Sequence, residues 1–294
     1  MKSIMLLVNP NAGRGGYKTV LSAVLETFYC GGWLPTVYFT QRSGEAPGLV
    51  EAHAAAYDLV SCMGGDGTLS EVAEGLMRGA VRRPIAYIPL GTANDVAHTL
   101  GLSSKPADCA RQLLAGTPLP YDMGRFGEDS YFTYVAAFGA FTEVSYETPQ
   151  DAKQALGHMA YMLEALSNLG NLTAYHGVVE HDGGVIEGDF VFGAITNSTS
   201  VAGLVKLDDR TVDLGDGLSE VLLVRQPRDL REFGDIVSAV LSGDLSGPNV
   251  SFFKSSRVDI RFDVPVAWTR DGEDGGRHQS VVLQNRHPGV QIIV

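Results

Sequence analysis

Three glycine-rich turns, each preceded by a short apolar run, constrain the fold of this chain more than any other feature. The runs cover residues 4–8, 59–63 and 85–89, and they lead into turns at residues 9–16 (NPNAGRGG), 64–68 (GGDGT) and 89–95 (PLGTAND). Helix-prone segments follow, so strand, turn and helix repeat along residues 1–122. This repetition predicts a parallel, doubly wound α/β sheet, in which ligands bind beyond the carboxyl ends of the strands.

The second half of the chain has a different pattern. Short strand-like runs separated by turn residues occur at 131–137, 174–180, 189–196, 217–224, 256–262 and 264–268. Such runs are typical of an antiparallel β-sandwich or barrel, and we expect one long helix at about residues 150–169. The sequence therefore predicts an α/β domain over residues 1–122 and a β-sandwich domain over 123–282, with the last strand, residues 283–294, free to rejoin the first domain.

Charge and cysteine content exclude several classes of function. The formal net charge is −12, and nucleic-acid binding needs a basic face that displaces counterions from phosphates. Three cysteines without a CxxC pattern predict neither a disulfide framework nor a zinc site, which favours a reducing compartment. The first residues do not read as a signal peptide, and no run is long enough to span a membrane. A cytoplasmic protein is the expectation.

The turns carry residue types suited to phosphate chemistry. Glycines lack a Cβ atom, so backbone N–H groups can approach phosphate oxygens closely. Asp66 is a candidate Mg²⁺ ligand beside a triphosphate, and Thr68 places a hydroxyl at the start of the following helix. In the third turn Thr92 can bond a phosphate, while Asn94 or Asp95 can cap a helix or anchor neighbouring loops. Tight turns with ordinary helix caps are the alternative interpretation.

Taken in this order, the motifs resemble the catalytic domain of the diacylglycerol kinases, including its bacterial lipid kinases. The resemblance continues through residues 121–125 (YDMGR), 216–218 (DGL) and 271–273 (DGE), so it spans nearly the whole chain. The GGDGT motif alone is shared with NAD kinases and, more loosely, with phosphofructokinases. The PLGTAND segment points to the lipid kinases, together with their sphingosine and ceramide kinase relatives.

This resemblance implies an ATP- and Mg²⁺-dependent lipid kinase. Such an enzyme transfers the γ-phosphate of ATP to the hydroxyl of diacylglycerol or a similar lipid, giving phosphatidic acid or its equivalent. The residues that the resemblance places at the nucleotide are Asn9, Pro10, Asn11, Ala12, Gly13, Thr40, Gly65, Asp66, Gly67, Thr68, Leu69, Ser70, Glu71 and Thr92.

The resemblance also assigns catalytic and metal-binding roles. Glu273 matches the proposed proton acceptor, Asp271 would assist this base or orient a metal, and Asp66 completes the catalytic candidates. Our hypothesis is that Glu273 faces the phosphate turns across an interdomain cleft. The bacterial enzymes also hold a structural Mg²⁺, and the implied ligands here are Asp213, Asp216 and the backbone carbonyl of Leu218. The loop departs from the family pattern at Gly215, where an aspartate is frequent.

Other functions stay open at this point. The acceptor could be a sphingoid base, phosphatidylglycerol or NAD, although the PLGTAND motif weighs against NAD. A nucleotide-binding regulatory protein without turnover is the alternative from another class. A lipid substrate implies transient peripheral contact with a membrane and places the protein in the cytoplasm, peripheral at the membrane. The resemblance to bacterial relatives suggests a homodimer, and no nucleic acid is expected as a partner.

Overall fold

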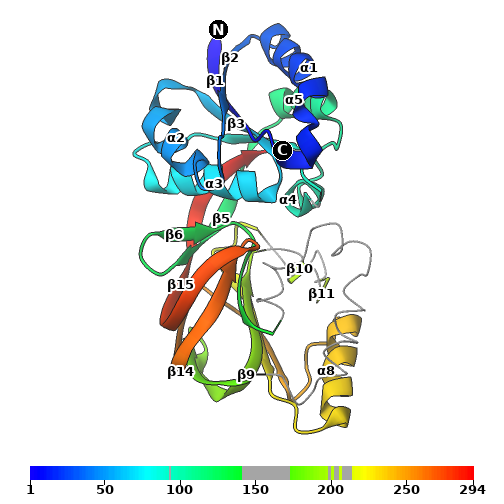
Figure 1. Cartoon of the computed structure of the whole chain (residues 1–294), viewed down its shortest axis with the longest axis vertical. Coiled ribbons are helices and arrows are strands. Elements are labelled where there is room, and N and C mark those ends of the chain that lie inside the picture. The colour runs from blue at the N-terminus through cyan, green and yellow to red at the C-terminus, as the bar shows by residue number, and fades with distance from the viewer. Residues whose placement is uncertain (93, 141–172, 198–199, 202–204, 207–213) are drawn as a thin grey trace. The chain divides into compact units, whose positions relative to one another are not determined.

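The computed structural model describes residues 1–92, 94–140, 173–197, 200–201, 205–206 and 214–294 (Figure 1). The helix expected at about 150–169 and the implied ligand Asp213 lie outside these residues. The chain forms two compact units. The first contains residues 1–123, 129–133 and 286–294, and the second contains residues 124–128 and 134–285. Within the described residues, no helix is long and apolar enough to cross a membrane.

The first unit is built on parallel strands. Its strands β1 (Lys2–Val8), β2 (Trp33–Phe39), β3 (Leu59–Gly64) and β4 (Ile85–Pro89) pair in the order β2-β1-β3-β4, and every one of these pairs is parallel. Residues 4–8 of β1 are fully buried, as the apolar run predicts. The last residues of β15 (Glu273–Ile293) pair in parallel with β4, so the end of the chain rejoins this sheet.

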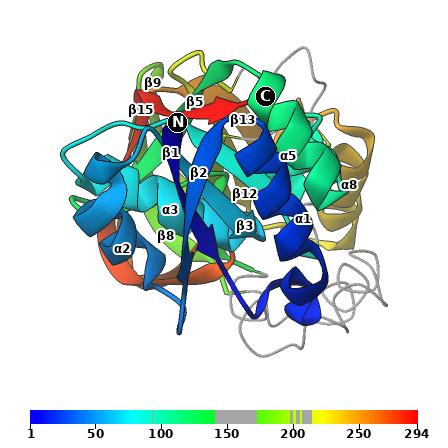
Figure 2. The ribbon, with the colours of Figure 1, turned by 90° about the horizontal axis from the view of Figure 1, so that it is seen from above.

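Helices cover both faces of this sheet (Figures 1 and 2). In Figure 2, α1 (Tyr17–Cys30) and α5 (Pro106–Ala115) lie together on one side, while α2 (Ala46–His53) and α3 (Asp66–Arg78) lie on the other. In α1 the buried residues, Val24 and Phe28, are four apart, so they share one face of the helix. The short α4 (Asp95–Thr99) follows the third glycine turn. The predicted doubly wound arrangement is thus present in this unit.

The second unit consists mainly of antiparallel strands. They are β7 (Val135–Gly139), β8 (Tyr175–His181), β9 (Gly184–Thr196), β12 (Ser219–Arg225), β13 (Val250–Ser255), β14 (Arg257–Arg270) and the first part of β15. Strand β7 pairs with β9 and β14, and β8 pairs with the same two strands, so these four close a ring of hydrogen-bonded neighbours. Strands β12 and β13 extend the sheet from β9.

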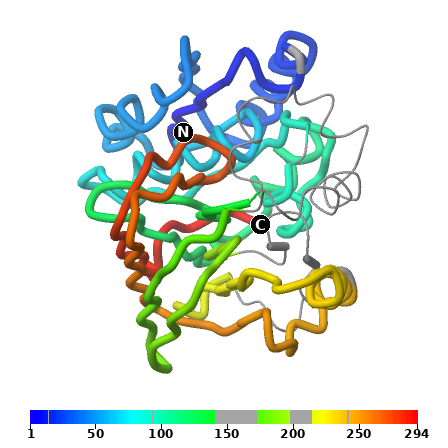
Figure 3. The backbone as a smooth tube through the Cα atoms, turned by 60° about the horizontal axis from the view of Figure 1, so that its bottom comes forward, coloured from blue at the N-terminus to red at the C-terminus, as the bar shows by residue number. Residues whose placement is uncertain are grey.

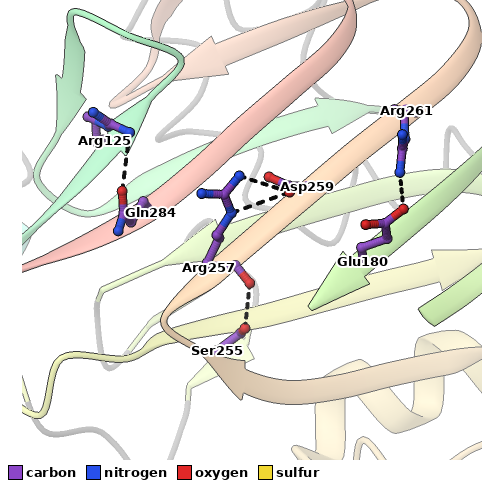
Figure 4. Close-up of polar contacts among 7 residues, drawn as sticks. All are labelled: Arg125, Glu180, Ser255, Arg257, Asp259, Arg261 and Gln284. Atoms are coloured by element: carbon purple, nitrogen blue, oxygen red, sulfur yellow. Dashed lines mark hydrogen bonds and ion pairs between the residues drawn. The ribbon is translucent and has the colours of Figure 1, made fainter. Parts of the chain in front are cut away.

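The core of the second unit is aromatic. Trp268 is fully buried and its ring lies 4.9 Å from that of Phe138 and 5.3 Å from that of Phe126. Such edge-on and tilted pairs add stability beyond the area that they bury. On the outer face, Arg261 pairs with Glu180 across β14 and β8, Arg257 pairs with Asp259, and Arg125 donates to Gln284 (Figure 4).

Helix α8 (Leu230–Ser242; Figure 3) packs on an apolar cluster formed with residues of β7, β9, β12 and β13. Its start is marked by a reciprocal cap, because Asp229 accepts a hydrogen bond from the Glu232 backbone and Glu232 accepts one from the Arg228 backbone. Gly243 ends the helix in the left-handed region. Ile236 of the helix packs with Leu222 and Val250 of the strands.

Some elements differ from the sequence predictions. The two runs at 256–262 and 264–268 form one strand, β14, whose pairing with β15 shifts register between Arg261 and Val266. This β-bulge explains why the alternation looked interrupted. The elements that were not predicted include α5, α8, β5 (Pro118–Phe126) and β13. Strand β5 pairs with β15 and with β6 (Ser130–Phe132).

Candidate functional site

The three glycine-rich turns meet at one edge of the first unit. Each follows the carboxyl end of a parallel strand, and backbone hydrogen bonds join neighbouring turns. The Asn9 amide donates to the carbonyl of Met63 at 3.0 Å, and the Leu90 and Gly91 amides donate to the carbonyl of Gly64 at 2.6 and 3.2 Å. This edge is where ligands bind in open α/β sheets.

Glycine is required where the turns touch. A Cβ atom on Gly91 would stand 2.6 Å from the Cα atom of Gly65, and one on Gly13 would overlap the carbonyl oxygen of Leu90. Gly13 also has a φ of +55°, in the left-handed region that other residues rarely adopt. The turns can therefore approach one another this closely only because Gly13 and Gly91 have no side chain.

Asn9 connects the first turn to the second. Its Nδ2 donates to the Oγ1 of Thr68 at 3.0 Å, and its Oδ1 accepts from the Asn11 amide at 3.0 Å. Thr68 is buried in the first turn of α3. The positive end of the α3 dipole thus points toward the turns, and helix N-termini of this kind bind phosphate in many proteins.

Asp66 connects the second turn to the third. Its Oδ2 accepts from the Asp95 amide at 3.0 Å, and its Oδ1 accepts from the Val96 amide at 3.2 Å and from the Tyr87 hydroxyl at 3.4 Å. Asp66 therefore caps α4 from another element. Burial raises the pKa of this carboxyl, and the hydrogen bonds from the Val96 and Asp95 amides act against that rise.

The third turn is shaped by Asn94. This residue has a φ of 54°, which Asn tolerates better than most residues. Its Oδ1 accepts from the Gly91 amide and its Nδ2 donates to the Gly91 carbonyl, both at 2.8 Å. The predicted choice between capping a helix and anchoring a loop is resolved in favour of the anchor. Thr92, between them, is exposed.

Glu71 holds a neighbouring loop. Its carboxylate accepts from the Gly44 amide at 2.9 Å, the Ala46 amide at 3.2 Å and the Ser43 hydroxyl at 3.4 Å. The loop begins after Thr40, which is buried and whose amide donates to the Val8 carbonyl at 3.1 Å. Glu71 thus positions the loop that follows Thr40.

The DGE segment lies in the second unit, at the turn between β14 and β15. Asp271 and Gly272 have φ values of 48° and 84°, so they form the tight two-residue turn that favours such residues. The Oδ1 of Asp271 accepts from the amides of Tyr134 and Val135, both at 3.0 Å. Glu273 is exposed and opens β15, paired with Arg270. The geometry makes Asp271 an anchor of the turn that carries Glu273.

The implied metal loop also lies in the second unit. Asp216 accepts from the Leu218 amide at 2.9 Å, and its other oxygen lies 2.7 Å from Nζ of Lys254. In the part of the chain that the structure describes, no group of three His, Cys, Asp or Glu residues could hold a metal ion. Lys254 and its second partner, Glu220, were not singled out from the sequence, although strand alternation could have placed them on one face.

A parallel α/β unit whose glycine-rich turns meet beside a helix N-terminus is an arrangement typical of phosphate-binding proteins. The comparisons with known proteins narrow this class. Residues 3–126 match the family model of the diacylglycerol kinase catalytic domain. The chain is 30% identical over 279 residues to a diacylglycerol kinase of Bacillus subtilis, covering 94% of this chain and 91% of that protein.

A second relative is a diacylglycerol kinase of Staphylococcus carnosus, 31% identical over 281 residues, with 94% of this chain and 90% of that protein covered. The chain therefore belongs to the diacylglycerol kinase family, and the predicted resemblance and kinase class are confirmed. The fold agrees with a crystal structure of a diacylglycerol kinase from Bacillus anthracis strain Sterne. Its TM-score is 0.78 at 22% identity, with 99% of this chain and 96% of that chain covered.

Proposed function

We propose that this protein transfers the γ-phosphoryl group of ATP to the hydroxyl of diacylglycerol or a similar lipid, giving phosphatidic acid or its equivalent. Family membership supports the reaction class. The observation that carries the proposal is the meeting of three glycine turns held by Asn9 and Asp66. Phosphoryl transfer depends mostly on positioning and charge neutralisation, so a preformed phosphate cradle is the main requirement.

In this proposal the first unit binds the nucleotide. Backbone amides of the turns and the N-terminus of α3 face the phosphates, and the buried hydroxyl of Thr68 is held in place by Asn9. The implied nucleotide residues from Asn9 to Gly13, from Gly65 to Glu71, and Thr40 and Thr92 act there. Glu71 contributes indirectly, by holding the loop after Thr40.

Asp66 fits a role beside Mg²⁺ only in part. A carboxylate offers about four lone-pair sites, and hydrogen bonds from Asp95, Val96 and Tyr87 occupy three of them. One site on Oδ2 is left for the cation or for a water molecule that the cation carries. When bound with the triphosphate, Mg²⁺ would supply charge neutralisation at the phosphate oxygens.

Glu273 is the proposed general base. Its carboxylate takes the proton of the lipid hydroxyl as the hydroxyl oxygen forms a bond to the γ-phosphorus. The bond from the γ-phosphorus to the bridging oxygen breaks, and ADP leaves with that oxygen. Asp271 acts through Glu273, because it anchors the turn that presents the base. A lipid substrate also leads us to propose transient contact with a membrane surface, and the family relationship leads us to propose a homodimer.

The test is transfer of label from radioactive ATP with Mg²⁺ and a panel of lipids in mixed micelles. We expect label in phosphatidic acid. Glu273→Gln removes the base but keeps the shape of the side chain, so kcat should fall by ~10²–10⁴-fold. Glu187→Gln is the matched control, since Glu187 is an exposed glutamate of the same unit. Asp66→Ala should also abolish labelling, through loss of the third turn.

Each other outcome changes the proposal in a defined way. Label in a sphingoid base or phosphatidylglycerol would keep the mechanism and change the acceptor, and label in NAD would move the protein to another kinase branch. Binding of ATP without label in any acceptor would favour a regulatory nucleotide-binding protein. Full activity of Glu273→Gln would remove Glu273 from the role of base.

A further inference from the structure

Three charged side chains meet at the start of β12, apart from any group used in the proposed reaction. Glu220 of β12 and Lys254 of β13 are direct partners in the antiparallel register, and Asp216 lies in the loop before β12. The Lys254 Nζ atom lies 2.7 Å from Oδ2 of Asp216 and 3.3 Å from Oε1 of Glu220. One ammonium group therefore contacts two carboxylates.

The three side chains differ strongly in their exposure to solvent. The Glu220 side chain is 1% exposed, compared with 29% for Lys254 and 23% for Asp216. Apart from the ion pair with Lys254, neither carboxylate oxygen of Glu220 has a hydrogen-bond partner in the described part of the chain. Thr196, its neighbour on β9, likewise has an unpartnered hydroxyl there. A carboxylate withdrawn from water needs a compensating cation, and Lys254 supplies the nearest one.

The described donors do not fit the structural Mg²⁺ that the family resemblance implies for this loop. Magnesium demands nearly octahedral oxygen coordination. Of the implied ligands, Asp216 has one oxygen bonded to the Leu218 amide and the other to the Lys254 ammonium. A divalent ion on that second oxygen would be repelled by the ammonium at close range. Gly215 also removes a carboxylate that is frequent in this loop.

We propose that the Lys254 ammonium replaces a structural metal ion in this protein. It holds the loop before β12 through Asp216 and offsets the buried charge of Glu220. The chain then needs no divalent cation at this position for folding. This proposal concerns the stability of the second unit and is independent of the proposed reaction.

The first experiment uses the unaltered protein. Thermal unfolding is followed without nucleotide or lipid, once in excess EDTA and once in millimolar MgCl₂. We expect the same melting temperature in both. A saturable rise of ~5–10 °C at a concentration about 100 times Kd, absent from Asp216→Asn, would overturn the proposal by revealing a metal site on Asp216.

The second experiment removes the ammonium. Lys254→Met keeps the length of the side chain but leaves Asp216 and Glu220 without their cation, so the melting temperature should fall by several degrees. Adding Glu220→Gln to Lys254→Met should recover part of the loss, because the buried charge is gone. Lys105→Met, which removes an exposed lysine, is the control.

Two results would contradict this second prediction. One is a Lys254→Met variant that melts like the unaltered protein. The other is a double variant no more stable than Lys254→Met, which would mean that Lys254 does not offset the charge of Glu220. If Lys254→Met does not fold, the metal titration of the unaltered protein still decides the proposal.

Discussion

Two substitutions of Asp271 can distinguish a structural role, in which it anchors the turn before Glu273, from a direct role in the reaction. Its Oδ1 accepts both the Tyr134 and the Val135 amides, and its backbone adopts φ 48°. Asp271→Asn keeps an oxygen in the place of Oδ1, and asparagine tolerates the left-handed region. Asp271→Ala loses both hydrogen bonds and places a less tolerant residue there. If Asp271 acts as an anchor, Asp271→Asn should keep the stability of the protein and Asp271→Ala should lower it.

The structure sets the size of the effect. Two hydrogen bonds on a half-buried group contribute ~0.5–1.5 kcal/mol each, and the left-handed conformation costs Ala ~1 kcal/mol. Asp271→Ala should thus destabilise the second unit by ~2–4 kcal/mol, or ~4–16 °C for a unit of 150–250 residues. Asp271→Asn should stay within ~1 kcal/mol of the unaltered protein.

The assay measures urea unfolding and lipid phosphorylation on the same preparations. For an anchor, Asp271→Asn keeps most of kcat, while Asp271→Ala loses stability and kcat together because Glu273 is no longer presented. The reasoning would be refuted by an Asp271→Asn variant that unfolds normally but has lost ~10²-fold or more in kcat. That result would require the negative charge of Asp271 in the chemistry.

Two further predictions follow from single contacts. Tyr87→Phe removes the hydroxyl that bonds both Asp66 and Asn94. KM for ATP should therefore rise ~2–5-fold, equivalent to ~0.5–1 kcal/mol, with kcat little changed. An unaltered KM would show that the hydroxyl does not hold the turns together. A hydrogen bond from the Ser256 amide lowers the pKa of Asp182 in the folded protein. Ionised Asp182 therefore stabilises the fold at pH values above its unfolded pKa of about 3.9. This stabilisation is lost as the pH falls through the lower pKa of the folded state. Urea unfolding should therefore show a stability gap between the unaltered protein and Asp182→Asn at pH 7 that closes in acid, and a gap independent of pH would contradict this assignment.

The parallel sheet was predictable because its signals are local. Each buried strand is a short apolar run, each turn is marked by glycine, and each helix has its own period, so residues 1–89 indicate alternating strands and helices directly, whereas the strand order β2-β1-β3-β4 comes from the structure. The motif residues that meet at the sheet edge follow from the same rule, since parallel strands end at the same edge.

The second unit was less predictable because its pairing is non-local. Strand β14 is interrupted by a bulge, and β15 begins at Glu273, well before the last strand that was expected at residues 283–294. Asp122 shows the same limit at one residue. It is fully buried and its partner is His287, 2.7 Å away, but 165 residues later in the chain. No local sequence pattern around Asp122 indicates a partner so far along the chain.

The acids of the motifs have structural contacts that the sequence did not indicate, while their functional roles stay predictions. Asp66, Glu71 and Asp271 were all placed at the nucleotide or at the chemistry, and in the structure each carboxylate accepts hydrogen bonds from at least two backbone amides of another element. A carboxylate is the strongest acceptor that a side chain offers to amides, so a loop that needs a fixed shape uses the same residue type as a metal site.

This use of acids also makes a net charge of −12 compatible with the nucleotide site that we propose. Carboxylates whose charge is already bonded to amides add less repulsion toward phosphate than free ones would. The attraction then comes from backbone dipoles and from the cation that accompanies the nucleotide. On this reasoning, we expect the shape of the turns, set by Gly13, Gly65 and Gly91, to control nucleotide affinity more than any single charged side chain, whereas Glu273 is the acid whose charge the proposed reaction uses.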